Sequence, residues 1–183
     1  MTTLLVILLA IVLAAVLYAR MVVRRLKRWK NNVARTWAQV DAVMRQRQEQ
    51  VPQLVELIRP QMRMERDLFD RILQARAMVA AALKQADVKL LGPRETQLKR
   101  QFAELRAQLA NYPQVRMNAD VVKQLGRLGA VEAQLTKCRD AFNAAVASSN
   151  AGIRKRPYSQ LARYFGLTEF ELLTVEAASP QRP

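Results

Sequence analysis

The stretch VMRQRQEQVPQLVELI, residues 43–58, combines the periodicity of an amphipathic helix with a proline in its interior. A proline inside a helix removes one backbone hydrogen bond and clashes with the preceding turn, at a cost of about 3 kcal/mol. Apolar residues nevertheless keep the same helical phase on both sides of Pro52: Val33, Trp37, Val40, Met44, Val51, Val55 and Ile58. We therefore predict one long helix, kinked at Pro52, rather than a helix boundary.

Upstream of this helix lies an apolar run, LLVILLAIVLAAVLYA, from Leu4 to Ala19. With its flanks it approaches the roughly 20 residues that a helix needs to cross a bilayer. The alternatives are a helix buried in a protein core and a cleaved signal peptide. Only Met-Thr-Thr precedes Leu4, and the run lacks a small-x-small cleavage site, so a signal peptide fits less well. We expect a retained transmembrane anchor over residues 1–23.

A cluster of basic residues follows the apolar run, whereas the first acidic residue of the chain is Asp41. Its members are Arg20, Arg24, Arg25, Lys27, Arg28 and Lys30. Positively charged residues next to a span tend to remain on the cytoplasmic side. We therefore expect the N-terminus outside, the remainder of the chain in the cytoplasm, and Trp29 near the lipid headgroups.

Three further helices are expected after the first one. The apolar spacing predicts a helix over about residues 61–85 and another over about residues 119–153. Between them, LLGPRET is expected to contain a turn, and Pro93 within it is expected to open the third helix. NYPQVRMNAD reads as a loop between the last two. Long helices with short connections pack as antiparallel neighbours. The fold class is therefore all-α, with an anchor followed by an antiparallel up-and-down four-helix bundle.

The C-terminal part of the chain is expected to add little to this bundle. A short amphipathic piece, LARYFG, follows the fourth helix, and LTEFELL is expected to form one more helical turn. We place the end of the helical domain, which begins at residue 24, at about residue 170. Residues 171–183 are expected to form a disordered tail.

Composition argues against the common catalytic and metal-binding chemistries. The chain has no histidine and one cysteine, Cys138, and it contains no glycine-rich phosphate loop. It therefore lacks the commonest general base, the commonest metal ligand and a histidine partner for a thiol nucleophile. We expect no enzymatic activity, no metal and no cofactor. The net charge of +15 favours anionic partners without choosing among them.

Polar residues also occur at or beside positions that face the bundle interior. They are Asp41, Arg47, Arg139, Asn143 and Asn150. They could form a functional cluster, or a hydrogen-bonded network that links the first helix to the fourth. Burial of an unpaired charge is costly, so we expect Asp41 to pair with an arginine. The structural network is the favoured interpretation.

Several of these segments resemble the LemA family. TWAQVD at residues 36–41, Arg47 and VPQLVELI at residues 51–58 are similar to its first signature, with Pro52 on the signature proline. NYP at residues 111–113 resembles its Tyr-Pro loop. The fourth helix and the segment after it agree through Glu132, Arg139, Phe142, Asn143, Val146, Asn150, Pro157 and ARYFG. Gln53, where the family has Asn, and Ser149, where it has an aromatic residue, depart from the pattern.

The resemblance implies a small bacterial membrane protein with a helical domain and no established enzymatic activity. We expect a scaffold or adaptor in the bacterial inner membrane, with lipid and other membrane proteins as partners and self-association as a further expectation. The alternative is a membrane-tethered nucleic-acid-binding protein, although no groove-entering motif or row of stacking aromatics is visible. A hydrolase that uses the carboxylates of Asp41 and Glu132 is the least favoured hypothesis.

Overall fold

The computed structural model describes residues 2–155, 158–159 and 168–175, and the described residues are mainly helical and contain no strand. Three short helical elements connect the long helices: η1 (Arg63–Glu65), η2 (Leu109–Asn111) and α4 (Pro113–Arg116). The long helices are α1 (Thr2–Ile58), α2 (Arg66–Lys84), α3 (Val88–Gln108) and α5 (Ala119–Arg154). The predicted all-α class is confirmed.

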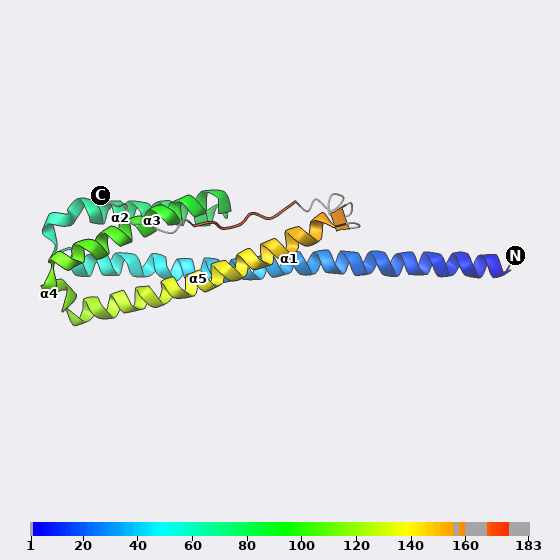
Figure 1. Cartoon of the computed structure of the whole chain (residues 1–183), viewed down its shortest axis with the longest axis horizontal. Helices are drawn as coiled ribbons and strands as arrows, with labels where there is room; N and C mark the ends of the chain where they lie inside the picture. The colour runs from blue at the N-terminus through cyan, green and yellow to red at the C-terminus, as the bar shows by residue number, and fades with distance from the viewer. Residues whose placement is uncertain (1, 156–157, 160–167, 176–183) are drawn as a thin grey trace.

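The long helices lie side by side, except at the N-terminal end of α1. Helix α5 runs back along α1, and α2 and α3 pair with each other, with α2 also contacting α1 (Figure 1). The N-terminal part of α1 extends alone beyond the other helices (Figure 1). One helix therefore belongs both to the packed domain and to the exposed apolar extension.

Helix α1 passes through Pro52 without a break. A proline at position 52 has no N–H to donate to the carbonyl four residues earlier, which is that of Gln48. Arg76 of α2 supplies the missing donor, because its Nε donates to the Gln48 carbonyl at 2.7 Å. The predicted continuity of the helix is thus confirmed and has a physical explanation, while the kink remains a prediction.

The turn before α3 differs from the expected one. We predicted that the third helix opens at Pro93, and this was wrong, because α3 begins at Val88 with Pro93 in its interior. Ala86 adopts a left-handed backbone conformation, with φ of 50°, and reverses the chain direction. The side chain of Asp87 then caps the helix by accepting a hydrogen bond from the N–H of Leu90 at 3.2 Å.

The C-terminal segment also differs from the expectation of a helical turn, because residues 168–175 form neither helix nor strand and follow an extended course along the helices (Figure 1). Leu173 in this segment is fully buried. The predicted domain boundary at residue 170 therefore falls inside a segment that packs on the helices. The expected helix LARYFG lies outside the described residues, as do residues 176–183 of the expected tail.

Apolar side chains fill the interior in two clusters. The larger one runs the length of the packed helices and includes the stripe of α1, in which Val40, Val51 and Ile58 are fully buried. The smaller one, made of Val22, Leu26 and Ile153, lies where α1 leaves the domain. Since Val22 belongs to this cluster, the packed domain begins before residue 24.

The contact between Arg76 and the Gln48 carbonyl predicts non-additive effects of two substitutions. Arg76→Met should lower the free energy of unfolding by about 1–3 kcal/mol, because it leaves a partly buried carbonyl without a donor. In a Pro52→Ala background the restored N–H at position 52 serves that carbonyl, so the same substitution should cost less. Urea unfolding of the full chain in mild detergent, followed by circular dichroism, measures both.

Arg71→Met is the matched control, since Arg71 lies on the same helix and pairs with Glu104 while about half exposed. Exposed pairs contribute little, so this change should cost less than about 1 kcal/mol. Equal costs of Arg76→Met with and without Pro52 would contradict the explanation.

Candidate functional site

The N-terminal part of α1 presents large apolar side chains without protein neighbours. Leu4 is 72% exposed and Leu9 is 70% exposed. Among the described residues, α1 is the one helix that is long and apolar enough to cross a membrane, and its apolar window is not buried at all. The alternative of a buried core helix is therefore excluded. Exposure of such side chains to water costs about 1.5–3 kcal/mol each, so this surface needs an apolar cover.

Basic side chains surround α1 where the apolar segment ends. All six residues of the predicted cluster, which we call the basic collar, are exposed: Arg20, Arg24, Arg25, Lys27, Arg28 and Lys30. Arg25 is also tied to the domain, because its Nη1 donates to the Tyr158 hydroxyl at 2.9 Å and its guanidinium lies 5.9 Å from the centre of that ring. The collar thus lies directly at the end of the packed helices.

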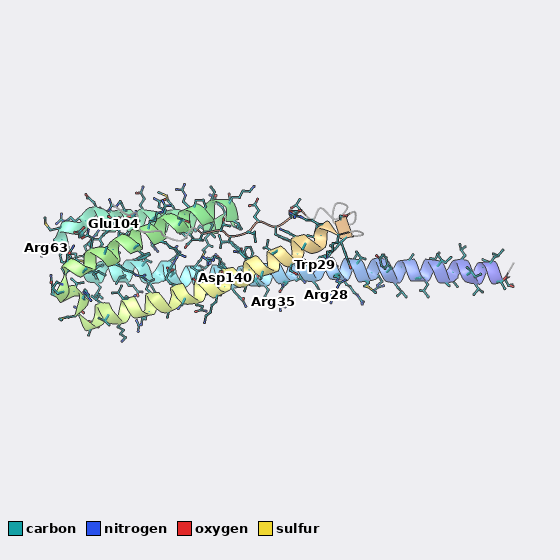
Figure 2. All side chains as sticks on the ribbon, viewed as in Figure 1. Arg28, Trp29, Arg35, Arg63, Glu104 and Asp140 are labelled. Carbon is teal, nitrogen blue, oxygen red and sulfur yellow. The ribbon has the colours of Figure 1, made fainter. Side chains whose placement is uncertain are left out.

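Trp29 attaches this end of the domain to α1 more firmly than expected. We predicted this ring near the headgroups, but it is half-buried, and it meets the Tyr158 ring edge-on at a centroid distance of 5.3 Å. A Cβ added at Gly152 of α5 would overlap the Trp29 ring, so the glycine permits the close approach. Figure 2 shows Trp29 where α1 passes the end of α5, with Arg28 beside it. No flexible linker therefore separates the collar from the domain.

Among the residues that the structure describes, Arg47 of α1 is the one fully buried cation. Its Nη2 pairs with the carboxylate of Glu95 on α3, and its Nη1 donates to that of Glu132 on α5 at 3.0 Å. Burial alone would lower the pKa of Arg47, but the two carboxylates outweigh it and raise the pKa above its ordinary value. A single guanidinium thereby joins three helices.

Asp41 and Arg139 do not share hydrogen bonds or ion pairs with this group in the described structure. Asp41 pairs with Arg45, one turn further along α1, at 2.9 Å. Arg139 pairs with its neighbour Asp140 at 3.2 Å, and Figure 2 places Asp140 on α5. We expected Asp41 to pair with an arginine, and it pairs with Arg45, but we did not predict the role of Glu95. Glu95 could have been found as an acid within the apolar stripe of α3, between Leu91 and Leu98.

Asn143 and Asn150 hold the extended residues 168–175, which we call the strap. Asn150 donates from Nδ2 to the Phe170 carbonyl at 2.8 Å, and its Oδ1 accepts from the Phe170 N–H at 2.9 Å. Asn143 binds Leu173 in the same way, at 3.0 and 2.9 Å. Both asparagines therefore bind the backbone of the strap. The predicted polar residues thus form three separate groups: Arg47, the pairs of Asp41 and Arg139, and the two asparagines.

Two ion pairs flank the asparagines. Arg154 of α5 donates from Nε and Nη2 to the two carboxylate oxygens of Glu169, at 2.7 Å each, and these bonds lower the pKa of Glu169. Lys89 of α3 pairs with Glu171 at 2.7 Å, which raises the pKa of Lys89. Within the described part of the chain, no group of three or more histidine, cysteine, aspartate or glutamate side chains could hold a metal ion.

Comparison with known families agrees with these features. The model of the LemA family matches residues 36–183, so the chain belongs to the LemA family. The resemblance carried by the Trp37, Pro52 and Tyr112 segments is thereby confirmed. No curated protein gives a significant match to the chain. The matched range includes α1 from residue 36 onward, the other helices, the buried Arg47 and the strap, and it begins after the apolar segment.

The buried ion pairs predict a specific pattern of stability changes. Arg47→Met should lower the free energy of unfolding by about 3–5 kcal/mol, because it leaves Glu95 buried without a counter-charge. The double change of Arg47 and Glu95 to Met should recover most of this loss, since Glu132 is partly exposed and can be hydrated. Urea unfolding in mild detergent measures both.

Arg45→Met breaks the exposed pair with Asp41 and serves as control, with an expected loss below about 1 kcal/mol. A double variant no more stable than Arg47→Met would show that the stranded carboxylate is not the reason for the loss.

Proposed function

We propose that the chain is a single-pass protein of the bacterial inner membrane whose helical domain is a non-enzymatic scaffold or adaptor for other membrane proteins. In this proposal the N-terminus lies outside and the domain lies in the cytoplasm, where α1, α2, α3 and α5 act as an up-and-down four-helix bundle with α1 kinked at Pro52. The basic collar faces the anionic headgroups of the inner leaflet.

The observation that carries the proposal is the continuity of α1 from an uncovered apolar segment into the core. Lipid is the apolar cover that suits a helix of this length, since about 30 Å of hydrocarbon corresponds to 20 residues. The six basic residues follow at the depth of the headgroups, where each contributes about 1 kcal/mol near an anionic leaflet. The rigid junction at Trp29 and Gly152 would hold the domain against the membrane surface.

The interior charges favour a structural role over a catalytic one. Arg47 is fully buried and bound to two carboxylates, so its guanidinium is not accessible to a substrate from solvent. The exposed pair of Asp41 and Arg45 lies apart from that group. These observations support a binding protein rather than the carboxylate-based hydrolase.

The adaptor proposal is tested by crosslinking in intact cells followed by mass spectrometry. The full-length chain should capture a small set of membrane proteins, and a copy lacking residues 1–19 should not. The deletion ends there because Val22 and Leu26 belong to the packed domain.

Three results would count against the proposal. Capture of the same membrane proteins by both copies would show that the anchor is not needed. Capture of nothing but further copies of the chain would favour self-association, and capture of nucleic acid would favour the tethered nucleic-acid-binding alternative. In the last case a salt-sensitive mobility shift on DNA should follow.

A further inference from the structure

The strap is bound in the manner of a peptide ligand, through its backbone. Phe170 and Leu173 are three residues apart, which is about 10 Å in an extended chain. Asn150 and Asn143 are seven residues apart on α5, which is also about 10 Å in a helix. Because the two spacings match, each asparagine amide closes a pair of hydrogen bonds with one strap residue. This recognition depends on the extended conformation and not on particular side chains.

Selectivity for sequence comes from the strap side chains. Leu173 is fully buried, whereas its neighbour Leu172 is 48% exposed, as expected for the alternation of an extended chain. Phe170 packs against the apolar cluster beside Trp29. The carboxylates of Glu169 and Glu171 meet Arg154 and Lys89. The contacts are thus made by an acid, an aromatic residue, a second acid and, two positions later, a leucine.

A glycine of α3 allows the backbone of the strap to lie close to the helix. Gly92 is buried, and a Cβ added there would overlap the carbonyl oxygen of Thr174. A backbone atom cannot move aside as a flexible side chain does, so any larger residue at position 92 would push the strap away. We call Lys89, Gly92, Asn143, Asn150 and Arg154 the strap site.

We propose that the strap site is a docking site for an extended acidic segment of a partner protein, and that residues 168–175 fill this site in cis. The partner segment carries an aromatic residue between two acids and a leucine three positions after the aromatic one. This inference rests on the adaptor proposal and deepens it, because it states the chemistry by which a partner would be recognised.

Charge and competition both favour this kind of partner. Arg154 and Lys89 are exposed cations that attract an acidic segment. A tethered segment competes at an effective concentration of the order of millimolar, so the strap excludes weak and unrelated peptides. A partner held in the same membrane is also locally concentrated, and it can therefore displace the strap where a dilute soluble peptide cannot.

The test uses a fluorescent peptide with the sequence of residues 168–175 and the full chain in detergent micelles. Leu173→Asp places a charge in a fully buried position and should empty the site. Leu172→Asp is the matched control, because that neighbour is half-exposed. By fluorescence anisotropy, the Leu173→Asp chain should bind the peptide saturably and at least tenfold more tightly than the wild type or the Leu172→Asp chain.

Binding should fall at least tenfold when the peptide leucine that corresponds to Leu173 is replaced by aspartate, or when Asn143→Leu and Asn150→Leu are added to the emptied chain. Circular dichroism checks that the helices persist, and Leu173→Ala replaces Leu173→Asp if they do not. The proposal would be overturned if the folded Leu173 variant did not bind the peptide saturably. It would also be overturned if the substitutions of Asn143 and Asn150 left the affinity unchanged.

A wild-type chain that forms a dimer, lost on Leu173→Asp and kept on Leu172→Asp, would show that a second copy is the occupant and would also overturn the partner proposal. The peptide assay contains no membrane protein partner. Its failure would therefore leave the crosslinking test of the adaptor proposal untouched.

Discussion

Helix α1 is one continuous helix that contains both the apolar segment and the stripe of buried core residues, and the other long helices pack around its buried part. Near its C-terminal end, the carbonyl of Gln48, which Pro52 leaves without a helical donor, accepts a hydrogen bond from Arg76, and this contact supports the last turns of the helix. Helix α5 packs along α1, and the guanidinium of Arg47 on α1 reaches both Glu95 of α3 and Glu132 of α5. A helix that ended at Pro52 would lose its last turns, in which Leu54, Val55 and Ile58 are buried. The apolar segment and the core of the packed domain are thus joined by one continuous helix.

Arg47 and two asparagines of α5 bind specific partners in or beside this interior. Arg47 would be strongly destabilising if both carboxylates were absent, since an unpaired buried charge is costly. Asn143 and Asn150 follow the same principle with neutral groups, because each uses both polar groups of its amide to bind the N–H and the C=O of one strap residue. The buried ion pairs of Arg47 hold α1, α3 and α5 together, and the two asparagines hold the strap against α5. The asparagines bind a segment at the surface of the helices, whereas Arg47 is enclosed among them. This difference in position separates the structural role of Arg47 from the proposed docking role of the strap site.

The sequence predicted those features that depend on local periodicity. The phase of the apolar stripe across Pro52 predicted a continuous α1, and the spacing of Val121, Leu128, Leu135 and Phe142 predicted α5 to within one residue of its end. Long-range partners were harder, because nothing near Gln48 indicates that Arg76 serves its carbonyl. Glu95 was hidden by the expectation that Pro93 opens a helix, whereas the left-handed Ala86 and the cap at Asp87 start it earlier. The strap was misjudged since EFELL has a helical composition, and its extended form is imposed by asparagines about 20 to 30 residues away.

The central claim is that α1 carries the domain on the cytoplasmic face of a membrane, with its first residues outside. Its most direct test is labelling of single cysteines by an impermeant maleimide in spheroplasts, in a Cys138→Ala background. Thr3→Cys should react in intact spheroplasts. Ala14→Cys should remain protected, and Met64→Cys, at a position 89% exposed in the structure, should react only after permeabilisation. Labelling of Met64→Cys from outside would reverse the orientation, and loss of the Thr3→Cys label from the mature chain would show that the apolar segment is cleaved rather than retained.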